Sequence, residues 1–123
     1  MSIKFIPVIE DSAFSLLARL KAGDGDYVTQ TAISSIAYSV NRLDTGDSVG
    51  TGTLTVADVI FDTLQKDSRW TEDSKGYNFL WSVNPTLVPD GGVHYRVEVT
   101  FTPATGYPYK VIWDLYVTPT FGS

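Results

Sequence analysis

Cysteine is absent from this 123-residue chain. Its absence excludes disulfides, thiolate nucleophiles and cysteine-based zinc sites, so packing alone must hold the fold together. Positive charge is also scarce: the formal net charge is −5, and the basic residues are scattered singly from Lys4 to Lys110. We therefore expect no nucleic-acid partner, because an acidic chain without a basic patch repels phosphates.

Long apolar runs are missing too, although 43% of the residues are hydrophobic and 13% are aromatic. This composition predicts a globular chain rather than a disordered one, and it offers no stretch long enough for a membrane-spanning helix. The first residues, MSIKFIPVIED, lack the basic segment and apolar core of a secretion signal, so we expect no membrane crossing. The length predicts a single domain.

The most regular pattern lies near the C-terminus, at residues 94–117. There polar and apolar residues alternate along two arms, HYRVEVTF and KVIWDLYV, as in strands with one buried face. Pro103, Gly106 and Pro108 separate the arms and interrupt strand pairing. The pattern predicts a β-hairpin whose apolar face organises the rest of the chain.

Shorter alternating stretches, separated by turn residues, precede this hairpin. They predict an edge strand or arm at residues 3–9 and strands near 14–20, 35–41, 53–56 and 77–83. We expect DTGDSVGTG, residues 44–52, to form a turn. Residues 58–66 fit either a strand or a helical turn, and Thr55 with Asp58 resembles a capping box. About seven strands at this spacing predict an antiparallel β-sandwich.

Residues that could carry catalysis are few. His94 is the one histidine, and the alternation places it on the solvent-facing side of its strand. No sequence motif links it to a nucleophile such as Ser82 or Thr100. No glycine-rich phosphate loop precedes a helix. We therefore expect neither enzymatic activity nor a cofactor.

Asp24 and Asp26, in the stretch GDGD, offer oxygen ligands that calcium could use. Further ligands at the offsets of an EF-hand loop are missing. Aspartate and glycine favour tight turns by themselves, so a plain turn is the preferred interpretation. No metal site is predicted, and calcium at these two residues is the weak alternative.

Aromatic residues near the hairpin tip are candidates for a ligand platform. Tyr107 and Tyr109 are expected to be exposed there, and Trp70 lies in a polar loop. Such rings could stack on a sugar or a base. For Trp70 a second interpretation is that it caps one end of the core.

A second candidate surface comes from an apolar surplus. Ile112 and Tyr116 are expected on the face of their strand opposite to that of Trp113. The N-terminal segment adds further apolar residues, namely Phe5, Ile6 and Val8. Together they exceed what one sandwich core requires, so another strand or another subunit should cover them. The sequence leaves open whether the N-terminal arm or a neighbouring chain covers Ile112.

Taken in order, the segments LLARLKAGDGDYVTQ, ISSIAYSV, GTGTLTV, GYNF, GGVHYRVEVTF and VIWDLYV resemble small immunoglobulin-like domains of tailed-phage virion proteins. They are also similar to the N-terminal domains of phage baseplate upper proteins. The turn before Tyr95 resembles the corner in which such domains bond a tyrosine hydroxyl to nearby backbone. The resemblance implies a sandwich at residues 10–118, with an arm or edge strand at 1–9 and a tail at 119–123.

What the resemblance implies is adhesion without catalysis. The expected role is a structural protein of a phage particle, in capsid decoration, the head–tail junction or the tail. It would be assembled in the cytoplasm of the bacterial host and would dock on other virion subunits or on copies of itself. The alternative is a β-sandwich module that binds carbohydrate or a cell surface through Tyr107, Tyr109 and Trp70.

Overall fold

The computed structural model describes residues 3–9, 12–21, 27–67, 70 and 74–119. This part of the chain is mainly β-structure. Its strands are β1 (Ile3–Ile9), β2 (Phe14–Ala18), β3 (Ile33–Arg42), β4 (Ser48–Leu54), β5 (Ile60–Gln65), β6 (Tyr77–Val83), β7 (His94–Pro103) and β8 (Tyr109–Thr118). Its helical turns are η1 (Gln30–Ala32), α1 (Val56–Val59) and η2 (Pro85–Leu87). None of these turns has the length and apolar character that crossing a membrane requires.

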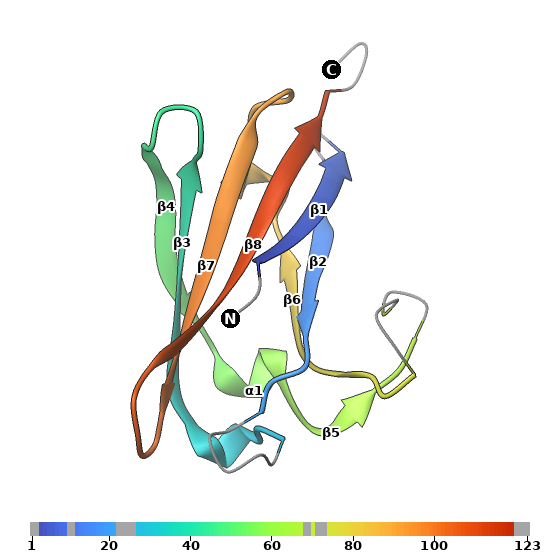
Figure 1. The fold of residues 1–123 in the computed structure, drawn as a ribbon, viewed down its shortest axis with the longest axis vertical. Coiled ribbons are helices and arrows are strands. Elements are labelled where there is room, and N and C mark those ends of the chain that lie inside the picture. Colours follow the sequence, from blue (N-terminus) through green and yellow to red (C-terminus); the bar gives the residue numbers. More distant parts are fainter. Residues whose placement is uncertain (1–2, 10–11, 22–26, 68–69, 71–73, 120–123) are drawn as a thin grey trace.

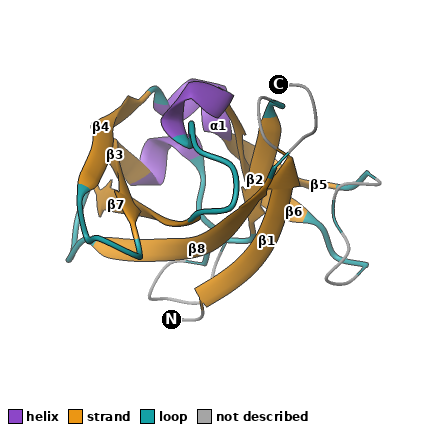
Figure 2. Cartoon of the chain, turned by 90° about the horizontal axis from the view of Figure 1, so that it is seen from above, coloured by secondary structure: helices purple, strands orange, loops and turns teal. Residues whose placement is uncertain are grey.

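The strands form two packed sheets (Figure 1), a larger one in the order β1-β8-β7-β3-β4 and a smaller one in the order β2-β6-β5. Neighbouring strands are antiparallel, except that β1 runs parallel to β8. Seen from above (Figure 2), the sheets face each other and α1 lies between β4 and the smaller sheet. In the larger sheet, β8, β7 and β3 have the order of strands G, F and C of an immunoglobulin sandwich, with β1 and β4 added at its edges. The predicted all-β, immunoglobulin-like sandwich is confirmed.

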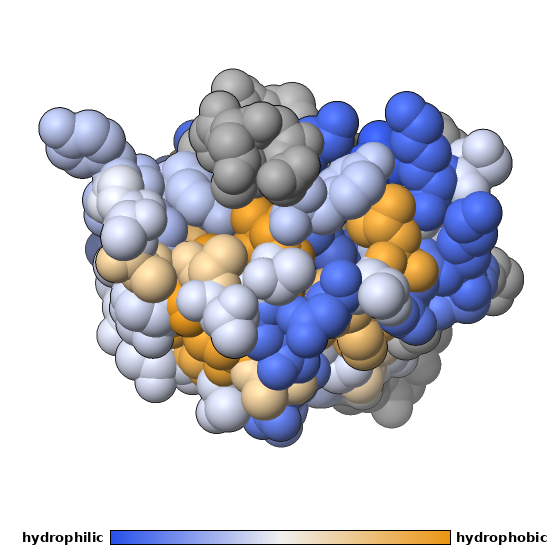
Figure 3. All heavy atoms as spheres, turned by 90° about the horizontal axis from the view of Figure 1, so that it is seen from below, coloured by the Kyte–Doolittle hydropathy of each residue, from blue (hydrophilic) through white to orange (hydrophobic). Residues whose placement is uncertain are grey.

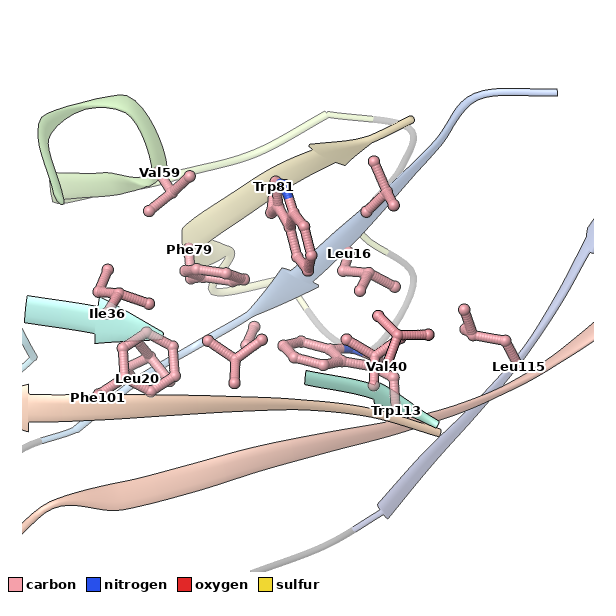
Figure 4. Packing of buried hydrophobic residues seen from close by; sticks show 14 of the residues in the cluster. Leu16, Leu20, Ile36, Val40, Val59, Phe79, Trp81, Phe101, Trp113 and Leu115 are labelled. Carbon is pink, nitrogen blue, oxygen red and sulfur yellow. The ribbon is translucent and has the colours of Figure 1, made fainter. Parts of the chain in front are cut away.

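The predicted hairpin is confirmed as β7 and β8, which pair from His94 opposite Tyr116 to Phe101 opposite Tyr109. Its inner face supplies much of the core between the sheets (Figure 4). There Phe79 of β6 meets Phe101 edge-on, with ring centroids 5.3 Å apart, and stacks on Trp113 at 5.8 Å. The alternation of the sequence therefore identified the buried side of both strands correctly.

A tyrosine corner joins β7 to the loop before it. Tyr95 is fully buried, and its hydroxyl accepts a hydrogen bond from the backbone N–H of Asp90 at 3.1 Å. Burial raises the pKa of this hydroxyl, so it keeps its proton at neutral pH. Two residues later, where immunoglobulin domains carry the second cysteine of their disulfide, this chain has Val97 with no exposed surface. Apolar packing takes the place of the disulfide.

Two predictions between β3 and β6 were wrong in detail. β4 begins at Ser48, inside the segment expected to be a turn. Gly52 is part of this strand, and a glycine is needed there because the ring of Tyr38 occupies the space beside it. An added Cβ would lie 2.6 Å from the tyrosine hydroxyl. The ambiguous residues form a helical turn and then a strand, and Thr55 makes no side-chain cap, so the capping box is absent.

Candidate functional site

The solvent-facing side of the larger sheet is the first candidate surface, and we call it the outer face. Cross-strand register places Ile112 opposite Glu98 and Tyr116 opposite His94. Ile112 and Tyr116 are half-buried, and the rings of His94 and Tyr116 lie 4.8 Å apart. The outer face includes Ala37, Ser39, Thr51, Thr53, His94, Arg96, Glu98, Thr100, Lys110, Ile112, Asp114 and Tyr116.

Two ion pairs flank Ile112 on the outer face. Arg96 forms two hydrogen bonds with Asp114, from Nε at 2.7 Å and from Nη2 at 3.0 Å, and this contact raises the pKa of Arg96. Lys110 donates to Glu98 at 3.2 Å. The charges of these two pairs cancel, so the middle of the outer face carries no net charge. A surface without net charge around a partly exposed isoleucine suits contact with another protein.

The two halves of the outer face differ in side-chain size. β7 and β8 contribute the paired charges, Ile112 and Tyr116, whereas β3 and β4 contribute Ala37, Ser39, Thr51 and Thr53. The small side chains let another surface approach the sheet closely, with the larger side chains as its border. This change of height across the sheet gives the surface a shape that a partner can match.

The N-terminal segment lies beside this surface as part of the sheet. β1 pairs with β8 so that Ile3 stands opposite Ile112. Val8 is 5% exposed and belongs to the core, so it offers no surface to a partner. The side chains of Phe5 and Ile6 lie outside the described part of the chain. Residues 3–9 therefore form an edge strand of the larger sheet, while a role of the N-terminal segment as an interface stays a prediction.

The second candidate is a cleft of 440 Å³ at the tip of the β7–β8 hairpin, between that tip and the connection from β2 to β3. Figure 3 views this end of the sandwich and shows apolar surface between polar side chains. The walls are largely apolar, with Lys21 and Thr105 as polar groups among them. The described residues that line the cleft include Val28, Ala32, Ile33, Pro103, Tyr107 and Tyr109.

Tyr107 and Tyr109 lie differently at this cleft. Tyr107 is 92% exposed, as expected for a hairpin tip. Tyr109 is half-buried instead: its ring stacks on Phe101 at 5.5 Å, and its buried hydroxyl has no hydrogen-bond partner among the described residues. Burial raises the pKa of this hydroxyl. The expectation that the tip exposes both tyrosines was wrong, because the strand turns the second one inward.

Trp70 is not among the described residues that line the cleft. Its ring lies 6.0 Å from that of Tyr77, and the guanidinium of Arg19 lies 5.8 Å above it. Trp70 therefore packs against Tyr77 at the start of β6, and the interpretation that it caps one end of the core stays a prediction. The three aromatic residues do not form one platform.

Asn78 supports the cleft, and sequence reasoning missed this residue. It is 1% exposed, although it has the strand parity opposite to that of Phe79 and Trp81. Its side chain accepts from the N–H of Leu20 at 2.7 Å and donates to the carbonyls of Leu20 at 3.0 Å and Val28 at 3.1 Å. Asn78 thus fixes both ends of the loop that borders the cleft. No short-range pattern reveals bonds between residues 58 positions apart.

The residues weighed for catalysis are not brought together. His94 lies on the outer face of β7, Thr100 lies six positions along the same strand, and Ser82 belongs to the other sheet. Six residues of a strand span roughly 20 Å, far beyond hydrogen-bond reach. Among the residues that the structure describes, no group of three or more His, Cys, Asp or Glu could hold a metal ion. Asp24 and Asp26 lie outside the described residues, so calcium binding there stays untested.

No known family model matches this sequence, and no curated protein matches it. One solved structure, from a photo-crosslinking study of the multimeric cell-adhesive interactions of VGSC beta subunits, is similar to this chain. The TM-score is 0.43 and the sequence identity 12%, over 94% of this chain and 92% of that one. A likeness of this size supports no inference about function.

Proposed function

We propose that this protein is a non-catalytic interaction domain that docks on protein partners through its outer face, as a component of a tailed-phage particle. The observation that carries the docking role is the pair Ile112 and Tyr116, both partly exposed on an open sheet face, with Ile112 between two ion pairs and Tyr116 beside His94. The phage assignment is supported by the resemblance of the strand-forming segments to virion domains. Other subunits of the particle are the expected partners.

The distribution of charge supports docking through this face. The chain carries a net charge of −5, which disfavours contact with other acidic proteins. On the outer face, however, each acid is paired with a base. The described acids without a place on this face lie in turns, helical turns and β5, namely Asp44, Asp47, Asp58, Asp62, Asp67 and Asp90. A partner that approaches the outer face therefore meets the least repulsion.

Mass spectrometry of purified particles, made in host cells that express the protein, tests the virion role. We expect the chain at a reproducible copy number. Ile112→Glu should reduce incorporation strongly, because it places an unpaired charge at the centre of the contact. Thr118→Glu is the matched control, since Thr118 is exposed on the same strand and has the same parity. Absence of the wild-type chain from particles would refute the phage role, and equal incorporation of both variants would refute the outer face as the interface.

Deletion of residues 1–9 is not a clean test of assembly. β1 pairs with β8 along its whole length, and Val8 is part of the core. Removing it exposes the edge of β8 and apolar core surface, so loss of assembly would follow from unfolding as readily as from a lost contact. Substitutions on the outer face leave the strand pairing intact and are therefore preferable.

The cleft favours a second candidate function, the binding of a ligand such as a surface glycan. An exposed tyrosine beside a concave, mostly apolar site with a few polar groups is typical of ligand pockets. A glycan array followed by titration calorimetry tests it. Tyr107→Ala should abolish any binding that the cleft provides, whereas Trp70→Ala should leave it unchanged, because Trp70 lies elsewhere. Binding that survives Tyr107→Ala would exclude the cleft as the ligand site.

A further inference from the structure

The larger sheet has two edge strands, and only one of them is protected from pairing with another strand. β1 contains Pro7, which cannot donate a backbone hydrogen bond and so discourages further pairing. β4 contains neither proline nor charge from Ser48 to Leu54. It pairs with β3 on one side and lies at the outer border of the sheet in Figure 1.

The free side of β4 carries unused hydrogen-bonding groups. In an antiparallel strand, alternate residues direct their N–H and C=O away from the neighbour. Within the described part of the chain, no backbone or side-chain partner is found for these groups in β4. The regular ladder between β3 and β4 extends from Gly50 to Leu54 and ends at an irregularity beside Val49. The available edge is therefore five residues long, counted from Gly50 through Leu54.

We infer that the β4 strands of two copies pair antiparallel about a two-fold axis at Gly52, which joins the two larger sheets into one. Residues directly opposite each other in an antiparallel pair have side chains on the same face of the sheet. If the core-facing sides of both copies are to lie on the same side of the joined sheet, the two-fold axis must therefore pass through a residue rather than between two residues. An axis at Gly52 pairs the whole regular ladder. It places Thr51 opposite Thr53 of the second copy on the solvent side and Gly50 opposite Leu54 on the core side.

The chemistry of the edge fits a second copy. Thr–Thr pairs across antiparallel strands are favourable, and this axis creates two of them. Gly52 has no side chain to collide at the axis, and its own Tyr38 already fills the core side. Neighbouring positions on β3, Ala37 and Ser39, are small and uncharged. Two copies with a net charge of −5 each can therefore approach along this edge without facing like charges.

This inference rests on the proposed docking role and extends it. A two-fold axis perpendicular to the sheet leaves the outer faces of both copies on the same side. The dimer then presents two docking faces at a fixed spacing, which multiplies weak contacts with an assembly that repeats its subunits. Edge pairing thus supplies the avidity that a single small face lacks.

Charge placement tests the pairing and its register. Light scattering on the purified wild-type chain should give twice the 13.5 kDa of one copy. Thr51→Lys with Thr53→Lys sets lysines opposite each other and should give the single-chain mass. Thr51→Lys with Thr53→Glu sets Lys opposite Glu and should stay dimeric. Mixing the double-lysine variant with a double-glutamate variant at the same positions should restore dimers.

Two outcomes overturn the inference: a wild-type chain that is monomeric at its highest soluble concentration, or a double-lysine variant that stays dimeric. Circular dichroism and the melting temperature check that each variant is folded. We expect folded variants, because Thr51 and Thr53 are both exposed. The docking role fails separately. A monomeric chain that still enters particles refutes the pairing alone, whereas a dimer that is absent from particles refutes the proposed function alone.

Discussion

The two ends of the β7–β8 hairpin each hold a tyrosine with a buried hydroxyl, but only the hydroxyl of Tyr95 has a hydrogen-bond partner among the described residues. Near the chain ends of the hairpin, Tyr95 accepts a hydrogen bond from Asp90. Near the tip, the hydroxyl of Tyr109 has no partner among the described residues. A buried hydroxyl without a partner costs roughly 1–3 kcal/mol. The same residue type therefore stabilises one end of the sandwich and weakens the other.

Polar contacts close the end that contains Tyr95. Arg42 binds Asp44 and Asp90 at 2.9 Å each, and so connects the β3–β4 turn to the loop before β7. The contact with Arg42 lowers the pKa of Asp44. The N–H of Gly92 donates to the carbonyl of Val117 and the N–H of Val117 donates to the carbonyl of Val93, which connects the same loop to β8. This end is built for stability.

The end that contains Tyr109 remains open. Its cleft has apolar walls, Tyr107 projects into solvent, and Asn78 holds the neighbouring loop from within. A buried polar group without a partner lowers the free energy of unfolding, and a fold tolerates it only where the remaining interactions keep that free energy positive. Stabilising polar contacts are therefore concentrated at the end that contains Tyr95, and the end that contains Tyr109 has the open surface that binding requires.

The largest effect is expected at Asn78. Asn78→Ala removes the partners of the Leu20 N–H and the Val28 carbonyl inside the protein, which should lower the free energy of unfolding by roughly 3 kcal/mol. Urea denaturation followed by fluorescence measures it. Asn84→Ala is the control, because Asn84 is exposed and only accepts from Thr86 at the start of η2, a contact worth about 1 kcal/mol. Equal losses in the two variants would contradict the supporting role of Asn78.

A smaller loss is expected from Tyr95→Phe. It removes the acceptor of the Asp90 N–H and should lower the free energy of unfolding by about 1 kcal/mol. The melting temperature and the urea midpoint should both fall, with the core otherwise unchanged. An unaltered midpoint would mean that the tyrosine corner adds no stability.

The same substitution at the open end should have the opposite sign. Tyr109→Phe removes a buried hydroxyl for which the described part of the chain offers no partner, so we expect stability unchanged or raised by up to about 1 kcal/mol. Parallel urea titrations of both variants compare the two ends directly. A loss like that of Tyr95→Phe would show that the Tyr109 hydroxyl has a partner after all.

Alkaline pH should separate the variants further. Burial raises the pKa of both tyrosines, so the folded protein keeps these protons to a higher pH than the unfolded chain does. Stability is therefore fully present below about pH 10, the pKa of a free tyrosine, and falls as the pH rises above it. Urea midpoints measured across this range should fall less steeply for Tyr109→Phe than for the wild type. Identical slopes would contradict the burial of the Tyr109 hydroxyl.

Local patterns identified most of the strands because burial of one face imposes a period of two. The alternation at 94–117 predicted the hairpin, and the turn before Tyr95 predicted the tyrosine corner. The start of β4 was mistaken for a turn because glycines usually mark turns. In this sheet, Gly52 is required by the ring of Tyr38 on the neighbouring strand. A contact across strands cannot be recognised from the glycine alone.

The alternation along each strand is enough to predict which side chains face the core, since it depends only on neighbours along the chain. Which polar groups have partners depends on how distant segments pack in the folded protein. Asn78 and Tyr109 have similar local surroundings of aromatic and polar residues, yet one bonds to a distant loop and the other to nothing described. The order of the strands likewise left β4 with a free edge and gave β1 a neighbour on β8. Long-range hydrogen bonds and free strand edges depend on which distant segments lie side by side. That arrangement results from the packing of the whole core and is not visible in any local pattern.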